Sequence, residues 1–353
     1  MTQSSKIAAR LLESGASAYA AYATNQLLDR HPELKDSFGP DAFGHWKNYF
    51  TQRVRELAAA VDESHGELFV SQFRWDRAAF QTRNVGEEIL LAALESLRMT
   101  LNEELPANCR SVVDGYVEQG LAVFGETPDP SSSLDQNDPT AGISARYLLT
   151  ILEGKSHQAI EMILDEHRKG LSLPKTFEVL MKAQAEIGSM WHRAEISVGE
   201  EHLVSNTTQR AMSILTYFAE RKPANGLSVV SAAVAGNTHD LGLRAISAFF
   251  ELDGWQAIHT GIDNPSEEIA NSVASFGASL VLISAALPTH LKATRESVQA
   301  VRSLQPDCKI ILGGRIFLDS PELWQQFNAD GFATAPVEAV AMGNQLCADR
   351  IQQ

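Results

Sequence analysis

The sequence is short of cysteine and of positive charge. Its 353 residues include only three cysteines (Cys109, Cys308 and Cys347), scattered and odd in number, so neither a disulfide framework nor a zinc site is indicated. Lys and Arg number 29 against 44 Asp and Glu, and the net charge of −15 argues against a nucleic-acid surface, which needs clustered cations. We find no recognition-helix module either, so any role in transcription would act through a partner.

Long apolar runs are also missing. No stretch approaches the roughly 18 apolar residues of a membrane span, and the first residues, MTQSSKIAARLLESG, lack the apolar segment of a signal peptide. We therefore expect a cytoplasmic protein without a membrane partner. The apolar content of 44% and charged content of 21% are ordinary for globular proteins, and the length allows two or three domains.

One segment divides the chain. Residues 125–141 read GETPDPSSSLDQNDPTA, a Pro-, Ser- and Asp-rich linker. Before it, residues 1–124 show apolar positions at spacings of three and four, which predicts an all-α domain. The expected helices cover residues 8–28, 42–61, 67–81, 85–101 and 109–123.

After the linker, two patterns follow each other. Residues 142–222 hold four amphipathic segments (143–153, 156–169, 174–193 and 199–221), which favour an antiparallel four-helix bundle. In residues 223–353, short apolar runs alternate with helical patterns, which predicts a doubly wound parallel sheet. The expected strands are residues 227–235, 256–259, 279–284, 309–312 and 331–334, and the expected helices are 241–253, 265–275, 289–304, 319–327 and 335–350.

A histidine follows the first expected strand. The stretch SAAVAGNTHDLG places His239 in a loop of small residues, with Gly242 where the next helix begins. Small residues allow a bulky group to approach the backbone, and an imidazole held on such a loop can coordinate a transition metal. Taken alone, the motif is more typical of a loop histidine that caps a helix.

Together with two later motifs, this loop resembles the cobalamin-binding domain family. The family pattern is Asp/Glu-x-His-x-x-Gly, then a serine after a middle strand (Ser284 in LVLISAAL), then a Gly-Gly pair (IILGGR). The resemblance implies that His239 is the lower axial cobalt ligand and that Ser284, Gly313 and Gly314 line the channel for the nucleotide tail. The family's acidic residue is Asn237 here, so the expected partner of the imidazole is a neutral amide, and Ala286 stands where leucine is usual. The implied cobalamin-binding residues of this domain are Asn237, His239, Asp240, Leu241, Gly242, Ser284, Leu287, Gly313 and Gly314.

A second motif, MWHRAEISVGEEH, precedes that domain. Trp191 should end one bundle helix and Glu201 should open the next, so an indole and a carboxylate meet at one end of the bundle. Considered alone, a core tryptophan beside surface charges explains these residues. The Trp-x9-Glu-His spacing upstream of the cobalamin-type domain resembles the cap of light-responsive adenosylcobalamin sensors. That resemblance implies an upper-face site made of Trp191, His192, Val198, Glu201 and His202, in which His192 takes the upper cobalt position after photolysis.

The N-terminal domain resembles the globin-like bilin-binding domain of photocobilins, through FGHWKNYFTQRVRELAAAV and LFVSQFRWDRAAFQTRNV. The resemblance implies non-covalent biliverdin. Cys109 is a possible attachment point but more often such a residue is a small buried hydrophobe. A haem bound by His31, His45 or His65 is an alternative. The candidate bilin residues are His45, Trp46, Tyr49, Phe50, Phe73, Arg74, Trp75, Arg77 and Arg83.

These resemblances imply a photoreceptor, not an enzyme, that binds adenosylcobalamin and biliverdin. Light would cleave the cobalt–carbon bond and shift the cap, and the protein would signal as a homodimer or higher homo-oligomer to an unknown partner. Two alternatives stay open: a corrinoid methyl carrier that serves a methyltransferase, and a cobalamin sensor that does not respond to light. An adenosylcobalamin mutase fits less well, because the sequence offers no barrel-sized substrate domain.

Overall fold

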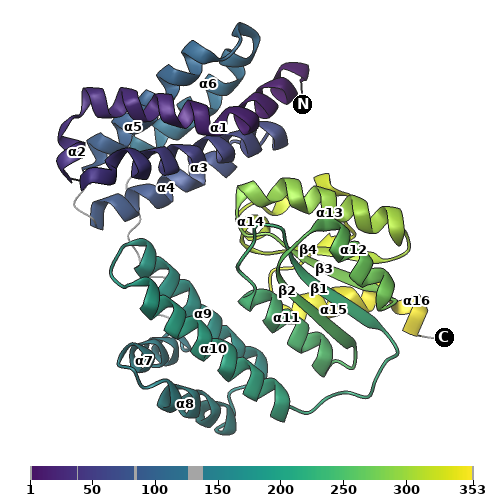
Figure 1. Ribbon diagram of the computed structural model, residues 1–353. Coiled ribbons are helices and arrows are strands. Elements are labelled where there is room, and N and C mark those ends of the chain that lie inside the picture. Colours follow the sequence, from purple (N-terminus) through teal and green to yellow (C-terminus); the bar gives the residue numbers. More distant parts are fainter. Residues whose placement is uncertain (1, 38, 83–85, 126–137, 352–353) are drawn as a thin grey trace. The chain divides into compact units, whose positions relative to one another are not determined.

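The computed structural model describes residues 2–37, 39–82, 86–125 and 138–351 (Figure 1). The chain divides into two compact units, Met1–Pro130 with His192–Ala194 and Ser131–Trp191 with Glu195–Gln353. Most of the expected linker, residues 126–137, lies outside the described residues. In the described part of the chain, no helix is both long enough and apolar enough to cross a membrane.

The first unit is helical throughout, as the apolar spacing predicts. Its core is lined by Phe50, Phe69, Phe73 and Leu57, all fully or almost fully buried. An expected helix at 85–101 begins slightly later, and a short helix and two 3-10 turns were not expected. The elements are α1 (Gln3–Arg30), α2 (Glu33–Ser37), η1 (Gly39–Asp41), α3 (Ala42–Glu63), α4 (Glu67–Thr82), α5 (Glu87–Glu104), α6 (Ala107–Ala122) and η2 (Val123–Gly125).

A buried group of charges joins α3 to α4 in this unit. Arg53 donates to Glu56 and to Asp76, each at 2.8 Å, and the Tyr49 hydroxyl donates to the same Asp76 oxygen at 2.9 Å. Burial raises the pKa of Glu56 to about 7, although the charge on Arg53 opposes the shift. Burial also raises the pKa of Asp76. This core therefore contains one carboxyl group, that of Glu56, whose protonation changes near neutral pH.

The second unit begins with the expected four-helix bundle. Its apolar core includes Tyr147, Phe177 and Leu215, and α10 starts at a capping box formed by Ser197 and Glu200. Each helix begins and ends within three residues of its expected bounds. The helices are α7 (Ala141–Leu152), α8 (Ser156–Arg168), α9 (Leu173–His192) and α10 (Val198–Phe218).

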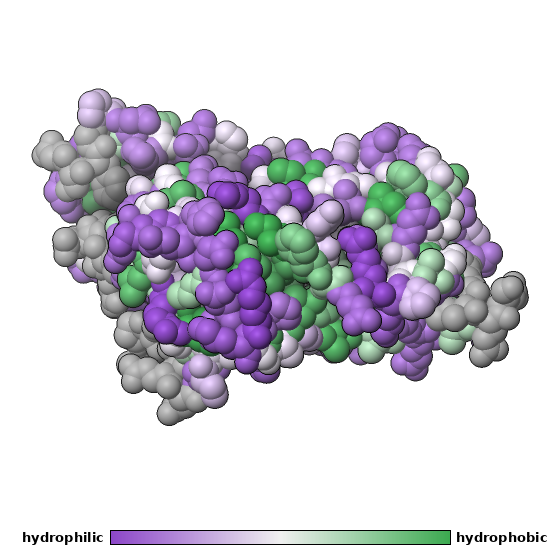
Figure 2. Space-filling view, turned by 90° about the horizontal axis from the view of Figure 1, so that it is seen from below, coloured by the Kyte–Doolittle hydropathy of each residue, from purple (hydrophilic) through white to green (hydrophobic). Residues whose placement is uncertain are grey.

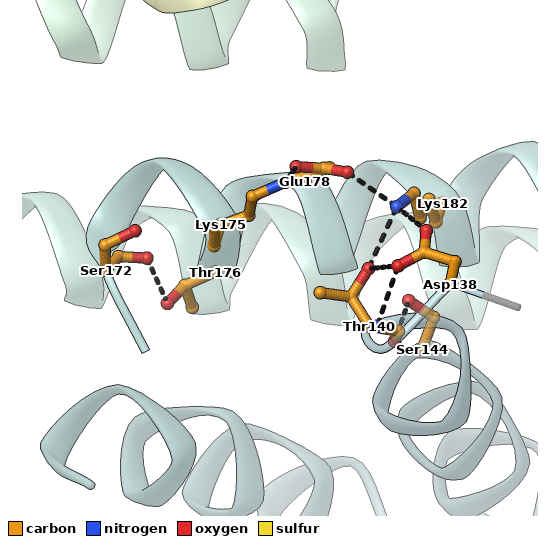
Figure 3. Close-up of polar contacts among 8 residues, drawn as sticks. All are labelled: Asp138, Thr140, Ser144, Ser172, Lys175, Thr176, Glu178 and Lys182. Atoms are coloured by element: carbon orange, nitrogen blue, oxygen red, sulfur yellow. Dashed lines mark hydrogen bonds and ion pairs between the residues drawn. The ribbon is translucent and has the colours of Figure 1, made fainter. Parts of the chain in front are cut away.

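An ionic cluster attaches the start of α7 to α9. Lys182 donates to Asp138, to Thr140 Oγ1 at 2.9 Å and to Glu178 at 2.6 Å (Figure 3). Asp138 in turn accepts from the backbone N–H of Thr140 at 2.8 Å. The hydrogen bond from Lys182 lowers the pKa of Asp138 well below its usual range. The described end of the linker is thus bound directly to α9, the helix that ends at His192.

The rest of the second unit is a parallel five-stranded sheet in the order β2-β1-β3-β4-β5. Helices cover both faces of the sheet, with α11 and α15 on one side and α12 and α13 on the other (Figure 1). This confirms the predicted fold class. The strands are β1 (Ser228–Val234), β2 (Gln256–Asn264), β3 (Leu280–Ser284), β4 (Lys309–Gly313) and β5 (Gly331–Phe332). The helices are α11 (Leu241–Leu252), α12 (Ser266–Ser275), η3 (Pro288–His290), α13 (Leu291–Leu304), α14 (Arg315–Asp319), η4 (Pro321–Phe327), α15 (Pro336–Leu346) and α16 (Ala348–Ile351).

Helix α11 packs against the sheet and also against the bundle. Ala245 belongs to the buried core of the bundle, with Leu241 and Ala248 packed at its edge. Phe249 makes an edge-to-face ring contact with Phe177 of α9, with centroids 5.1 Å apart. On the face drawn in Figure 2, hydrophobic residues gather in patches between hydrophilic ones.

Candidate functional site

The order β2-β1-β3-β4-β5 places a topological switch point between β1 and β3. In open α/β sheets, ligands bind beyond the carboxyl ends of the strands at that point, because the loops there leave in opposite directions. Three loops meet at this edge: residues 235–240 after β1, residues 285–287 after β3, and Gly314 after β4. The predicted lower-face residues lie in these loops or at the strand ends beside them, except for Leu241 and Gly242, which are the first two residues of α11.

His239 lies in the β1 loop, two residues before α11, with an exposed side chain. Asn237 holds this loop from within. Its fully buried amide donates to the backbone carbonyl of Ser284 at 3.0 Å and accepts the backbone N–H of His239 at 3.0 Å. We expected the amide oxygen to accept the imidazole N–H of His239, and the structure gives it the backbone N–H instead. A buried amide needs partners for both ends, and the two loops supply them.

Asp240 has partners of its own beside the cobalt-ligand candidate. Its Oδ2 lies 2.7 Å from Arg244 Nε and 3.2 Å from His259 Nε2, and His259 Nδ1 lies 2.9 Å from the Ser231 hydroxyl. Burial works against ionisation of Asp240, but the hydrogen bond from His259 and the charge on Arg244 lower its pKa overall. Ser231 is fully buried within β1, so this arrangement fixes the start of α11 and offers no accessible nucleophile.

The ends of β3 and β4 form the other side of the switch point. Ser284 is buried, and the Ala285 N–H donates to the Gly313 carbonyl at 3.0 Å. Gly314 has a φ of +98°, and a Cβ there would lie 2.2 Å from the Ala285 carbonyl oxygen. Only glycine fits this position. Leu287 is 40% exposed on the loop after β3.

The second predicted motif lies where α9 ends and α10 begins. Trp191 is 45% exposed, next to His192, the last residue of α9, and Val198, the first residue of α10, is 52% exposed. His202 Nε2 lies 3.6 Å from Glu201 Oε2, with the histidine side chain mostly in solvent. The helix–loop–helix thus presents an indole, an aliphatic side chain and a carboxylate at one end of the bundle.

Polar side chains inside the bundle orient Glu201, and the sequence analysis missed them. The Ser205 hydroxyl lies 2.6 Å from Glu201 Oε1 and 3.0 Å from Gln184 Oε1. Gln184 Nε2 donates to Thr208 Oγ1 at 2.9 Å, and the buried Tyr147 hydroxyl lies 3.2 Å from the same oxygen. The sequence does show polar residues at helical positions that face the core. Periodicity alone does not indicate which of these residues hydrogen-bond to one another.

The bilin candidates lie in the first unit, and the side chains of several are buried in its core. Trp46 and Phe73 are buried, as is Phe50. Arg77 Nη2 pairs with Glu87 at 2.7 Å, and Tyr49 donates to Asp76. Arg74 pairs with Glu67, His45 and Trp75 are exposed, Cys109 is buried, and Arg83 lies outside the described residues.

A hollow of about 610 Å³ in this unit has a different lining. It includes Asn25, Leu28, Lys35 and Phe43, and none of the bilin candidates. The structure therefore gathers some of the candidate aromatics but packs them against one another, with ring centroids 5.5 Å apart for Trp46 and Tyr49.

The residues at the switch point suit a large metal macrocycle better than a bare ion. Within the described ranges, no group of three or more His, Cys, Asp or Glu side chains could hold a metal. A single exposed imidazole can supply one axial ligand if a macrocycle supplies the equatorial ones. Gly242 and Gly313 add no side chain at the same edge, and a Cβ on Gly242 would meet nothing closer than Met181 Cε at 4.0 Å. The donor set and the bare backbone fit a corrinoid.

Comparisons with known proteins agree with this geometry. Residues 227–341 match the B12 binding domain family, and residues 143–216 match a second B12 binding domain family. The chain is therefore a cobalamin-binding domain protein, with the bundle and the α/β domain as its two matched parts.

Its relatives carry corrinoid names. A corrinoid protein of Desulfitobacterium hafniense is 24% identical over 204 residues, which cover 56% of this chain and 93% of the relative. Dimethylamine corrinoid protein 2 of Methanosarcina mazei is 26% identical over 121 residues, 33% of this chain and only 55% of that relative. The solved monomethylamine corrinoid protein of Methanosarcina barkeri shares the fold, with a TM-score of 0.50 at 18% identity over 58% of this chain and 98% of that one.

Proposed function

We propose that this cobalamin-binding protein is a light sensor that uses adenosylcobalamin. The observation that carries the proposal is the end of the bundle, where Trp191 and Val198 are exposed beside Glu201. Exposed apolar area of this kind favours a covering ligand, since burial gains about 25 cal/mol per Å². Adenosylcobalamin supplies a photolabile cobalt–carbon bond.

The chain's own residues would divide the work between the two faces of the cofactor. His239 would bind cobalt from below through one imidazole nitrogen. Trp191 and Val198 would cover the adenosyl group, and Glu201, oriented by Ser205, would accept hydrogen bonds from its ribose hydroxyls. Loss of the adenosyl group would remove the partner of Trp191 and shift the cap between two packings.

A second candidate function is a corrinoid methyl carrier for a methyltransferase. The relatives named dimethylamine and monomethylamine corrinoid proteins favour it, and they match the bundle and the α/β domain. A carrier must expose the upper face of its cofactor to partner enzymes, so it has no use for an indole held there. Residues before 143, which neither family model covers, are also unexplained by a carrier.

Biliverdin binding and signalling by assembly complete the proposal. Because Arg77 is paired with Glu87 and Arg74 with Glu67, the bilin propionates would have to displace one of these ion pairs. A homodimer or larger homo-oligomer would change its assembly in light. Light scattering after size-exclusion chromatography, in the dark and after illumination, tests that step.

The deciding experiment is an absorption spectrum of the protein with adenosylcobalamin and biliverdin, before and after green light. The sensor predicts a bound spectrum that converts irreversibly, and Trp191→Ala should alter the conversion. Leu149→Ala is the matched control, because Leu149 is an exposed apolar residue elsewhere on the bundle. A bound spectrum unchanged by light, with transfer of the methyl group from bound methylcobalamin to an acceptor substrate when a methyltransferase catalyses the reaction, would establish the carrier instead.

A further inference from the structure

A second imidazole lies at the switch point, and the sequence motifs did not point to it. His290 ends the 3-10 turn η3, after the loop that follows Ser284, and its side chain is only 5% exposed. It is close enough to His239 for the charge of that residue to affect it. A histidine buried this deeply in a ligand-binding loop needs partners for both ring nitrogens.

Both ring nitrogens have partners. Nδ1 accepts the backbone N–H groups of Ala286 and Leu287, each at 3.2 Å. The opposite side of the ring hydrogen-bonds to the backbone of Gly236, where a Cβ would lie 3.8 Å from His290 Nε2. Burial, with a smaller contribution from His239, lowers the pKa of His290 to about 4. The ring is therefore neutral at pH 7, with Nδ1 as acceptor and Nε2–H as donor.

The bonds of His290 connect the same two loops as those of Asn237, the loop after β1 and the loop after β3, but the side chain now comes from the second loop. Asn237 reaches from the β1 loop to the end of β3 through Ser284. His290 reaches from the β3 loop back to Gly236, at the start of the β1 loop. The segment that carries His239 is thus attached at two adjacent residues, to β3 through Asn237 and to η3 through Gly236. Two attachments restrict the loop where a single one would leave a hinge.

We propose that His290 is a positioning residue that sets the His239 loop for cobalt coordination through the backbone of Gly236, without touching the cofactor itself. The proposal rests on the proposed role of His239 as lower ligand. It assigns to the β3 loop a function beyond lining the nucleotide-tail channel. A ligand held in place beforehand loses less conformational entropy when it binds, so the gain appears as affinity.

Three substitutions separate the two halves of this contact. His290→Asn keeps an acceptor near the Nδ1 position for Ala286 and Leu287 but cannot reach Gly236. His290→Gln carries an amide N–H to about the Nε2 position and should restore part of the link to Gly236. His167→Asn is the matched control, since His167 is a partly buried histidine of the bundle, with Nδ1 2.8 Å from the Leu171 carbonyl oxygen.

The readouts are cobalamin affinity, the fraction of bound cobalamin with a histidine-on spectrum, and hydrogen exchange of the amides of residues 236–240 in the cofactor-free protein. For His290→Asn we expect affinity to fall about 10- to 100-fold, a smaller histidine-on fraction and faster exchange in that loop, with partial rescue by His290→Gln. Wild-type affinity, spectrum and exchange in His290→Asn would overturn the proposal. So would an affinity loss that follows only a general loss of thermal stability. If the wild-type protein itself binds cobalamin without a histidine-on spectrum, it is the role of His239 that fails.

Discussion

The two parts of the candidate site are built differently. The lower loops are tied down by backbone bonds, with Asn237 and His290 buried and Gly314 in a conformation that only glycine accepts. The cap carries its functional side chains on a helix end, where Trp191 and Val198 are largely exposed. The lower part is ordered by its own hydrogen bonds, while under the proposed function the cap would gain packing only when it covers a ligand. A lower face that is ordered without ligand suits permanent binding of the cofactor. An upper face whose packing depends on the ligand suits a conformational response to loss of that ligand.

The largest effect is expected when His239, the single metal-ligand candidate of the lower part, is replaced. His239→Ala should remove the histidine-on spectrum and weaken cobalamin binding on the order of 100-fold or more, because His290, the second imidazole that the structure describes at the switch point, is buried and bonded to backbone groups of its own loop. Titration by absorption measures both. His157→Ala, an exposed histidine of α8, should bind as wild type. An unchanged spectrum in His239→Ala would contradict the assignment.

The next prediction concerns the conformation of the lower loops in the cofactor-free protein. Gly314→Ala forces a Cβ to within 2.2 Å of the Ala285 carbonyl oxygen at a φ of +98°, and we expect a loss of about 2 to 3 kcal/mol in the free energy of unfolding. Gly188→Ala in α9 meets nothing within 4 Å and should stabilise by about 0.5 to 1 kcal/mol. Thermal unfolding of the cofactor-free protein compares them, and equal stabilities would refute a preset loop.

A third prediction extends the comparison to the first unit, whose core holds charges. Since the pKa of Glu56 is raised to about 7 from 4.5, the folded protein keeps a proton that the unfolded chain releases. The resulting stability is present below pH 4.5 and is lost as pH rises through 7. Glu56→Gln should change little at pH 5 and stabilise by about 2 kcal/mol at pH 8. Unfolding curves at the two pH values test this. A variant that is less stable than wild type at pH 8 would show that the ion pair with Arg53 outweighs burial.

The smallest effect on stability is expected at the cap. Because Trp191 is already 45% exposed, Trp191→Ala should change the unfolding free energy by less than about 0.5 kcal/mol and leave the histidine-on spectrum intact. Only the conversion by light should differ. A stability loss comparable to that of Gly314→Ala would mean that the indole packs within the protein, and the contrast between the two parts would disappear.

The sequence predicted the elements well where the signal is local. The start of α10 after Ser197 and the end of α9 at His192 agree with helix periodicity and capping. The second strand was expected to end at His259, yet β2 continues to Asn264 through register shifts around Gly261, which has a φ of +83°. The helix expected at residues 319–327 is a 3-10 helix at 321–327. Neither the bulge nor the tighter helix has a distinct local pattern.

The site was predictable only in part, for a related reason. His239, Ser284 and the Gly313–Gly314 pair follow strands whose carboxyl ends must meet, so topology alone brings them to one edge. The partners of these residues are set by contacts across the fold. Gln184 meets Ser205 across two helices, and His290 meets Gly236 across two loops. No spacing rule pairs such residues, and the bond from the backbone N–H of His239 to Asn237 was likewise not predicted.

Helix α11 belongs to two cores at once, through Ala245 and Phe249 on the bundle side and Phe250 on the sheet side. An α/β domain separated from its bundle would present that apolar stripe to water and would be prone to associate with other chains. Recombination between genes would therefore exchange what precedes Asp138, which is bound to α9, more freely than it would separate the bundle from the sheet. The two matched regions would be inherited as a pair.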